Sequence, residues 1–254
     1  MIDALIGSFL IAIGHHESLE WSASLPQVHI VSEAHQQIVQ GQPNVHKNLR
    51  NISEILHGDK NKPLIALTFD DGFDPAVSQQ MIDTLKAKRV LATFFLKGNW
   101  IAEEPVITQT IINDGHEIGN HSYAHPQFTK LPIIRIKQEI QDQENVLVRN
   151  HQYSPHPYFR FPYGARNPKI MKMVNDLGYT SIMWDIDTLD WATDKESIVK
   201  ETLTKAHNGA IILMHLGKSA TAEALPEIID GLRAKGFELV TISTLIDNDD
   251  AISP

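Results

Sequence analysis

The chain contains no cysteine, and this absence excludes disulfide bonds, zinc sites built on thiolates and cysteine nucleophiles. Positive charge is also scarce, because 22 lysines and arginines stand against 31 acidic residues and the formal net charge is -9. A nucleic-acid-binding surface needs a basic face, so we expect no nucleic-acid partner. The sequence has no Gly-x-Ser-x-Gly segment, which makes a serine hydrolase with a nucleophile elbow a poor candidate.

The apolar run at residues 4–13 is too short to span a bilayer as a helix, so we expect no integral membrane span. It has the length of the apolar part of a signal peptide, but it lacks a positive segment before it and carries Asp3 instead. A targeting signal and a helix packed on the domain both stay open. We expect residues 1–60 to form an N-terminal extension, with a helical pattern at 32–39, and residues 61–254 to form one domain.

From residue 62 onward, short apolar strand patterns alternate with helical patterns about seven times. The predicted strands are residues 64–69, 90–96, 117–119, 158–161, 180–184, 210–215 and 238–242. The predicted helices are residues 75–88, 104–114, 131–149, 168–177, 194–207 and 222–235. Glycines at the left-handed position expected after a helix follow four of them, namely Gly115, Gly178, Gly209 and Gly236. This alternation predicts an α/β fold with a parallel sheet, and it favours a distorted (β/α) barrel of seven or eight units over a doubly wound sheet.

Polar side chains gather where five of the predicted strands end, which is where such barrels carry their chemistry. Each one alone has an ordinary explanation as a capping residue, a histidine at the edge of the core or a surface ion pair. All five together indicate a site. The residues are Asp70 and Asp71, His121 and His125, Arg160 to Gly164, Asp187 with Asp190 and Trp191, and His215. Asp187 is equally well explained as a loop-capping residue.

The adjacent carboxylates of Asp70 and Asp71 repel one another and need partners. His121 and His125 are spaced i, i+4, which on a helical turn puts both on one face and within reach of one ion. A nearby aspartate would complete a His-His-Asp set that leaves positions open for water and substrate, as in catalytic zinc sites. A divalent cation would then neutralise one aspartate and Arg160 the other, so that one carboxylate is a ligand and its neighbour is free to act as a base.

Five ordered segments, TFDDG, HSYAH, RFPYG, DTLDW and LMH, resemble the motifs of the polysaccharide deacetylases, also known as the NodB-homology family or carbohydrate esterase family 4. The resemblance covers about residues 62–246, and ATFFLKGNW and DGHEIGNHSYAHP further resemble the peptidoglycan-type members. No motif position departs from the family pattern, so nothing in the sequence marks an inactive homologue.

The resemblance implies a NodB-type barrel and assigns a role to each matching residue. By this resemblance the metal ligands are Asp71, His121 and His125. Asp70 is the general base, and Arg160 is the arginine that pairs with it. The metal is divalent, with zinc as the first choice and cobalt or another divalent ion as the alternative.

The same resemblance makes His215 the general acid and Asp190 the aspartate that holds and charges it. The backbone N–H of Tyr163 matches the oxyanion donor, and Pro162 shapes its loop. Trp191 and Leu213 match residues that line the acetyl pocket. Amide hydrolysis requires these parts, because it needs an activated water, a stabilised oxyanion and a proton for the departing amine.

We therefore expect a hydrolase that removes N-acetyl groups from N-acetylglucosamine-type units of a polysaccharide such as peptidoglycan or a chitin-like polymer. The expected partner is a polysaccharide or oligosaccharide, and the expected location is secreted or in the cell envelope. Alternatives on the same scaffold are O-deacetylation of xylan and hydrolysis of a cyclic amide. A third alternative is a protein that binds carbohydrate without catalysis.

Overall fold

The structure, a computed structural model, describes residues 54–247. Its strands are β1 (Glu54–Ile55), β2 (Leu64–Asp71), β3 (Thr93–Leu96), β4 (Glu117–Asn120), β5 (Tyr158–Phe159), β6 (Thr180–Ile182), β7 (Ile186–Asp187), β8 (Ile211–Leu216) and β9 (Glu238–Val240). Its helices are α2 (Pro75–Ala87), α3 (Gly98–Glu103), α4 (Pro105–Asn113), α5 (Ile133–His151), α6 (Pro168–Asp176), α7 (Lys195–Lys205), α8 (Ser219–Ala234), α9 (Ile242–Asp247) and the short 3₁₀ turns η2 (Phe128–Lys130) and η3 (Pro162–Gly164). The apolar run at 4–13 and the helix predicted at 32–39 lie outside the described residues.

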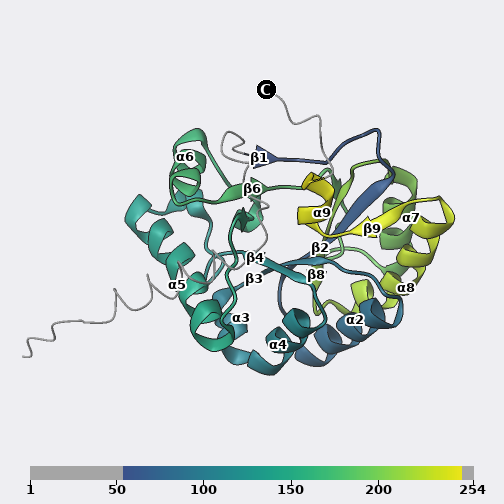
Figure 1. Cartoon of the computed structure of the whole chain (residues 1–254), viewed down its shortest axis with the longest axis horizontal. Coiled ribbons are helices and arrows are strands. Elements are labelled where there is room, and N and C mark those ends of the chain that lie inside the picture. Colours follow the sequence, from purple (N-terminus) through teal and green to yellow (C-terminus); the bar gives the residue numbers. More distant parts are fainter. Residues whose placement is uncertain (1–53, 248–254) are drawn as a thin grey trace, which may run out of the picture.

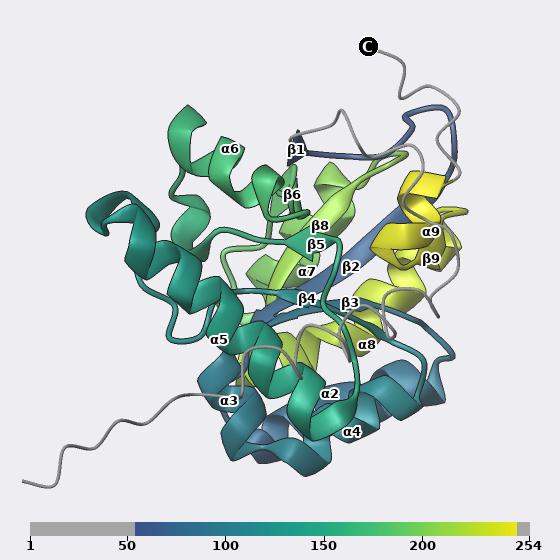
Figure 2. The same ribbon diagram turned by 60° about the vertical axis from the view of Figure 1, so that its left-hand side comes forward.

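The strands form one parallel sheet in the order β1-β6-β5-β4-β3-β2-β8-β7, and β9 pairs with the first part of β2. The sheet curls, and helices lie in an arc around its outer side (Figures 1 and 2). Within the described part of the chain, no ladder joins β1 to β7, so the barrel stays open between these two strands. The predicted distorted (β/α) barrel is confirmed in this open form. No helix of residues 54–247 has both the length and the apolar character needed to cross a membrane.

Several predicted boundaries shift. The sheet begins before residue 61, because β1 pairs with β6 and the Glu54 carboxylate binds the Arg166 guanidinium. The strand predicted at 180–184 ends at Ile182, and β7 follows as a separate strand. Three of the four marked glycines directly follow the C-cap of a helix, whereas Gly209 lies in the loop beyond α7.

Three helices of the described residues begin at an N-cap whose side chain is hydrogen-bonded to the first turn. The side chains of Asp74, Asn167 and Asp194 accept hydrogen bonds from backbone N–H groups in the first turns of α2, α6 and α7. These bonds satisfy donors that a helix start leaves without partners, and in α2 and α6 a proline then fixes the first helical residue. The apolar faces of α2 and α8 then pack on β2 and β8, whose side chains are almost fully buried.

The register of the sheet brings the ends of its strands to one level. Asp70 in β2 is paired with His215 in β8, and Asp71 is paired with Leu96 in β3. Leu96 is in turn paired with Asn120, and Asn120 with Phe159. His121 and Arg160, the residues that follow Asn120 and Phe159, therefore start from the level of the two aspartates.

The turn after β2 depends on a glycine. Gly72 has φ +116°, which side-chain-bearing residues rarely adopt, and a Cβ there would lie 2.4 Å from the Trp100 ring. The Trp100 indole N–H also donates to the Phe73 carbonyl at 3.3 Å. Trp100 thus holds the turn that directs the two aspartates.

We expect Gly72→Ala to lower the free energy of unfolding by about 3 kcal/mol or more, because backbone strain and a clash with the buried Trp100 ring add together. Gly236→Ala is the matched control, since Gly236 also has a positive φ (+89°) but a Cβ there meets nothing within 4 Å. It should cost roughly 1 kcal/mol. Denaturant unfolding of the two variants checks this prediction. Equal decreases in the free energy of unfolding would mean that the Trp100 ring moves aside without destabilising the protein.

Candidate active site

A cavity of about 670 Å³ opens at the C-terminal ends of the strands. It is lined by carboxylates, histidines, aromatic rings and one lysine. The lining residues are Asp70, Asp71, Phe73, Lys97, His121, Ala124, His125, Phe161, Tyr163, Trp184, Asp187, Trp191, Leu213 and His215. Most of the residues predicted for the site therefore meet in one place.

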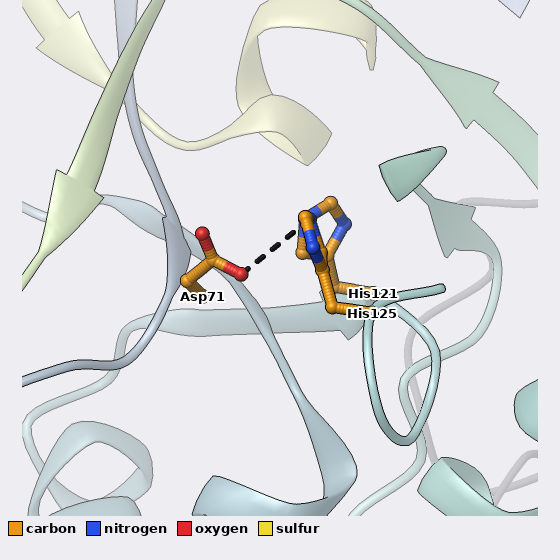
Figure 3. Close-up of side chains that lie close together, drawn as sticks. All are labelled: Asp71, His121 and His125. Carbon is orange, nitrogen blue, oxygen red and sulfur yellow. Dashed lines mark ion pairs between the residues drawn. The ribbon is translucent and has the colours of Figure 1, made fainter. Parts of the chain in front are cut away.

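Asp71, His121 and His125 form a compact donor set (Figure 3). Each offers one ligand atom, and these atoms lie within 4.8 Å of one another. His125 Nε2 is 3.5 Å from Asp71 Oδ1. Two imidazoles and a carboxylate are suitable ligands for a divalent transition metal.

The chemistry of these donors fits a cation. Asp71 Oδ1 is buried and accepts no hydrogen bond from the described residues. His121 Nδ1 lies 2.8 Å from the Arg160 carbonyl, which can only accept, so Nδ1 carries the proton and Nε2 presents a lone pair to the site. Burial, assisted by the neighbouring His125, lowers the pKa of His121 to about 3, and burial also lowers the pKa of His125. Both rings are thus neutral at neutral pH, as metal ligands must be.

The prediction that the two histidines share a face of a helical turn is wrong. His121 directly follows β4, and residues 121–125 form a loop in which Ser122 (φ 65°) and His125 (φ 59°) are left-handed. The loop is closed by the His125 N–H, which donates to Ser122 Oγ at 3.0 Å. The two ring centroids nevertheless lie 4.8 Å apart, so the rings converge through turn geometry.

Left-handed backbone recurs around the cavity. Besides Ser122 and His125, the non-glycine residues with positive φ near the cavity are Asp71 (73°), Tyr163 (58°) and Leu189 (54°). Each such residue costs free energy that the surrounding packing has to offset, and clusters of this kind accompany functional sites.

Asp70 makes a buried ion pair with Arg160. Arg160 is fully buried, and its Nη1 donates to Asp70 Oδ1 at 2.7 Å. The other Asp70 oxygen, Oδ2, lies 3.7 Å from His121 Nε2 and so faces the donor set. Burial raises the pKa of Asp70, while the Arg160 guanidinium opposes that rise. Asp70 is therefore a carboxylate fixed at one oxygen and available at the other.

His215 contacts the buried carboxylate of Asp190. His215 Nδ1 lies 2.6 Å from Asp190 Oδ1, and its backbone N–H donates to Asp190 Oδ2 at 2.8 Å. Burial lowers the pKa of His215, but the hydrogen bond and charge of Asp190 outweigh burial and the net shift is upward. The Thr221 hydroxyl also donates to Asp190 Oδ2. No sequence pattern indicated Thr221, which lies in the first turn of α8.

The remaining predicted residues divide into two groups. Tyr163, Trp191 and Leu213 line the cavity, with Tyr163 70% and Trp191 62% exposed. The Tyr163 ring packs on His125 with centroids 4.4 Å apart. Pro162 is buried at the start of η3 and is not among the lining residues, which leaves it a role in shaping the loop. 

Asp187 is both a residue of the cavity and a loop-capping residue. It lines the cavity, and its Oδ1 also accepts the Leu189 N–H at 2.9 Å as a loop cap.

Three side chains were missed by the motif comparison. Phe73 directly follows the DDG segment, and its ring centroid lies 6.3 Å from that of His215. Lys97 Nζ is 4.8 Å and Lys218 Nζ is 3.9 Å from the Phe73 ring centroid. Their signal in the sequence is weak, since a lysine after a strand or before a helix is usually a solvated charge.

Comparison with known proteins identifies relatives of this chain. The model of the polysaccharide deacetylase family matches residues 57–182. The peptidoglycan-N-acetylmuramic acid deacetylase PdaC of Bacillus subtilis is 36% identical over 189 residues, which are 74% of this chain and 39% of that protein. The chain spans less than two thirds of the length of the curated relatives that it matches first.

Solved structures of the same fold include active and inactive proteins. The Bc1960 peptidoglycan N-acetylglucosamine deacetylase superposes with a TM-score of 0.74 at 31% identity, over 81% of this chain and 97% of that one. A CE4 family pseudoenzyme from Bacillus anthracis superposes with a TM-score of 0.73 at 30% identity, over 77% of this chain and 69% of that one. The chain therefore belongs to the polysaccharide deacetylases, the NodB-homology or CE4 family that its five motifs resemble.

Proposed function

We propose that this protein is a metal-dependent hydrolase that removes N-acetyl groups from the amino-sugar units of peptidoglycan. The observation that carries the proposal is the convergence, on one cavity, of the Asp71–His121–His125 set, the Asp70–Arg160 pair and the His215–Asp190 pair. The choice of polymer comes from the relatives, which are peptidoglycan deacetylases and so favour peptidoglycan over chitin and xylan. They also support a location in the cell envelope or outside the cell.

Asp71, His121 and His125 would hold the metal. A divalent cation there would supply Lewis acidity, which stabilises negative charge on oxygen and makes water more acidic. We propose zinc, since a set of two imidazoles and one carboxylate suits it, with cobalt as the next candidate.

The remaining residues divide the work of breaking an amide bond. Asp70 takes the proton of the attacking water through Oδ2, the oxygen that Arg160 leaves free. The Tyr163 backbone N–H donates to the oxygen of the acetyl carbonyl as charge develops on it. His215 gives a proton to the sugar nitrogen as the carbon–nitrogen bond breaks, so that a neutral amine and acetate leave.

A non-catalytic role is disfavoured by the proton-transfer groups. Binding a sugar requires neither a carboxylate fixed by a buried arginine nor an imidazole charged by a buried aspartate. Both arrangements are complete here, with the Arg160–Asp70 and His215–Asp190 contacts at 2.7 and 2.6 Å. The similarity to a pseudoenzyme makes a direct assay necessary.

The direct test is acetate release from peptidoglycan fragments, chitooligosaccharides, acetylated xylan and a cyclic amide. We expect peptidoglycan fragments to be the best substrate, a chelator to abolish release and added zinc or cobalt to restore it. Full turnover after complete removal of metal would contradict the proposed chemistry. Tight sugar binding without acetate release at any metal load would establish the non-catalytic alternative.

Substitution of Asp70 and of Asp71 should impair different properties of the protein. Asp71→Asn should lose bound metal, because a neutral amide is a weaker partner for a dication. Asp70→Asn should keep its metal and lose roughly 10²–10⁴ in rate as the general base disappears. It should also be less stable, since Arg160 stays buried without its counter-charge. 

Asp187→Asn is the control for this pair, because Asp187 also lines the cavity but lies outside the Asp71–His121–His125 donor set and accepts the Leu189 N–H. Metal analysis and acetate release on the three purified variants decide the assignment. Equal metal loss in the Asp70 and Asp71 variants would show that the two carboxylates chelate the ion jointly.

The fall of activity at alkaline pH should follow the deprotonation of His215. The protonated ring is the working form, so activity falls as pH rises through its pKa, and the Asp190 contact keeps that fall above the ordinary range of histidine. Asp190→Asn removes the contribution that raises this pKa, so the fall should move to lower pH with metal content unchanged. His207→Asn, which alters a histidine paired with Asp185, should leave the profile unmoved. An unshifted limb in the Asp190 variant would remove His215 from the role of acid.

A further inference from the structure

A cluster of two lysines and an aromatic ring, made of Phe73, Lys97 and Lys218, lies beside the cavity and has no part in the chemistry above. Lys97 precedes α3 and Lys218 precedes α8, so two separate elements bring their ammonium groups to one ring. Phe73 is 39% exposed, and both Phe73 and Lys97 line the cavity. The cluster therefore borders the space that substrate would occupy.

Among the described residues, neither ammonium group has a hydrogen-bond acceptor. Lys97 Nζ has only the distant Asp71 Oδ1, at 3.8 Å, and that oxygen belongs to the metal donor set. Lys218 makes no ion pair with any residue of the described range 54–247, and its ammonium group lies over the face of the Phe73 ring. An aromatic face holds an ammonium group but leaves its N–H donors free for an anion.

The two lysines of the cluster lie in an otherwise acidic environment. The chain as a whole carries a net charge of -9, and Asp70, Asp71 and Asp187 all line the cavity. A neutral substrate would need no cation at its rim. An anionic substrate would be repelled by the general charge of the protein, and it would need local positive groups to bind in the right position.

We infer that Phe73, Lys97 and Lys218 bind a carboxylate carried by the sugar unit that is deacetylated. This deepens the proposed function and rests on it. In peptidoglycan, the N-acetylmuramic unit carries a carboxyalkyl ether on the ring carbon next to the one that bears the N-acetyl group. Its carboxylate reaches only a few ångströms from the scissile amide, which matches a cluster whose ring is 6.3 Å from that of His215. The cluster selects an N-acetylmuramic unit with a free carboxylate over the neutral N-acetylglucosamine unit.

Lys218 is the residue to test, because Lys97 lies near Asp71 and its removal would also alter the metal donor set. The substrates are an N-acetylmuramic-type disaccharide with a free carboxylate and the same molecule with that group converted to a carboxamide. We expect the wild-type protein to show a kcat/KM about tenfold higher for the acid, and this ratio should shrink as salt is added. Lys218→Met should bring the ratio close to one by slowing the acid alone, and Lys218→Arg should keep most of it.

Lys235→Met is the matched control, since Lys235 is an exposed lysine at the opposite end of α8 and should leave the ratio unchanged. If both sugars are deacetylated equally by the wild-type protein, this inference falls while the proposed function stands. If neither sugar releases acetate but other peptidoglycan fragments do, the proposed function still stands, whereas it fails if no peptidoglycan fragment releases acetate. Calorimetric affinities for the two sugars then decide the inference, and equal affinities in wild type and Lys218→Met would overturn it.

Discussion

The site depends on the ion pair between Asp70 and Arg160, which is buried at the centre of the sheet. A buried guanidinium is tolerated only when its donors are satisfied, and here Nε donates to Ile182 O, Nη2 to Met183 O and Nη1 to both Thr68 Oγ1 and Asp70. The ring of Phe95 lies 4.1 Å from the guanidinium carbon. One side chain thus ties the end of β2 to β5 and to the end of β6, and it fixes the direction of the Asp70 carboxylate.

This pair also explains how two adjacent aspartates are accommodated at one strand end. Arg160 neutralises the first, and the second has a buried oxygen that no described residue hydrogen-bonds and that lies beside two neutral histidines. The His121 ring is oriented by the Arg160 main-chain carbonyl, so one arginine residue positions the carboxylate through its side chain and a metal donor through its backbone. The two carboxylates consequently differ in environment although they are neighbours in sequence, and that difference separates a base from a ligand.

The sequence was informative where chemistry depends on strand ends. Asp70, His121 and His215 follow from the periodicity of the strands, because parallel strands bring their C-terminal ends to one edge. It was less informative where the local backbone conformation determines the geometry. In the loop of His121 and His125, the left-handed residues are not glycines, so their residue types do not reveal the conformation.

Contacts between distant segments were harder still to anticipate. Thr221 hydrogen-bonds to Asp190, which lies 31 positions earlier in the chain, and Lys218 contacts Phe73, which is much farther away in sequence. Both residue types are common in exposed positions, so only the folded arrangement distinguishes them. The open edge between β1 and β7 likewise follows from strand order, which periodicity alone does not encode.

The left-handed residues around the cavity have a consequence for redesigning its specificity. Asp71, Ser122, His125, Tyr163 and Leu189 hold backbone conformations that β-branched side chains disfavour strongly, so random libraries at these positions would be depleted of folded members. Phe73 and Trp191 line the same space without positive φ and are partly exposed. The positions with left-handed backbone therefore tolerate few residue types, whereas Phe73 and Trp191 can be replaced more freely. Directed evolution toward new acylated sugars should randomise Phe73 and Trp191 first.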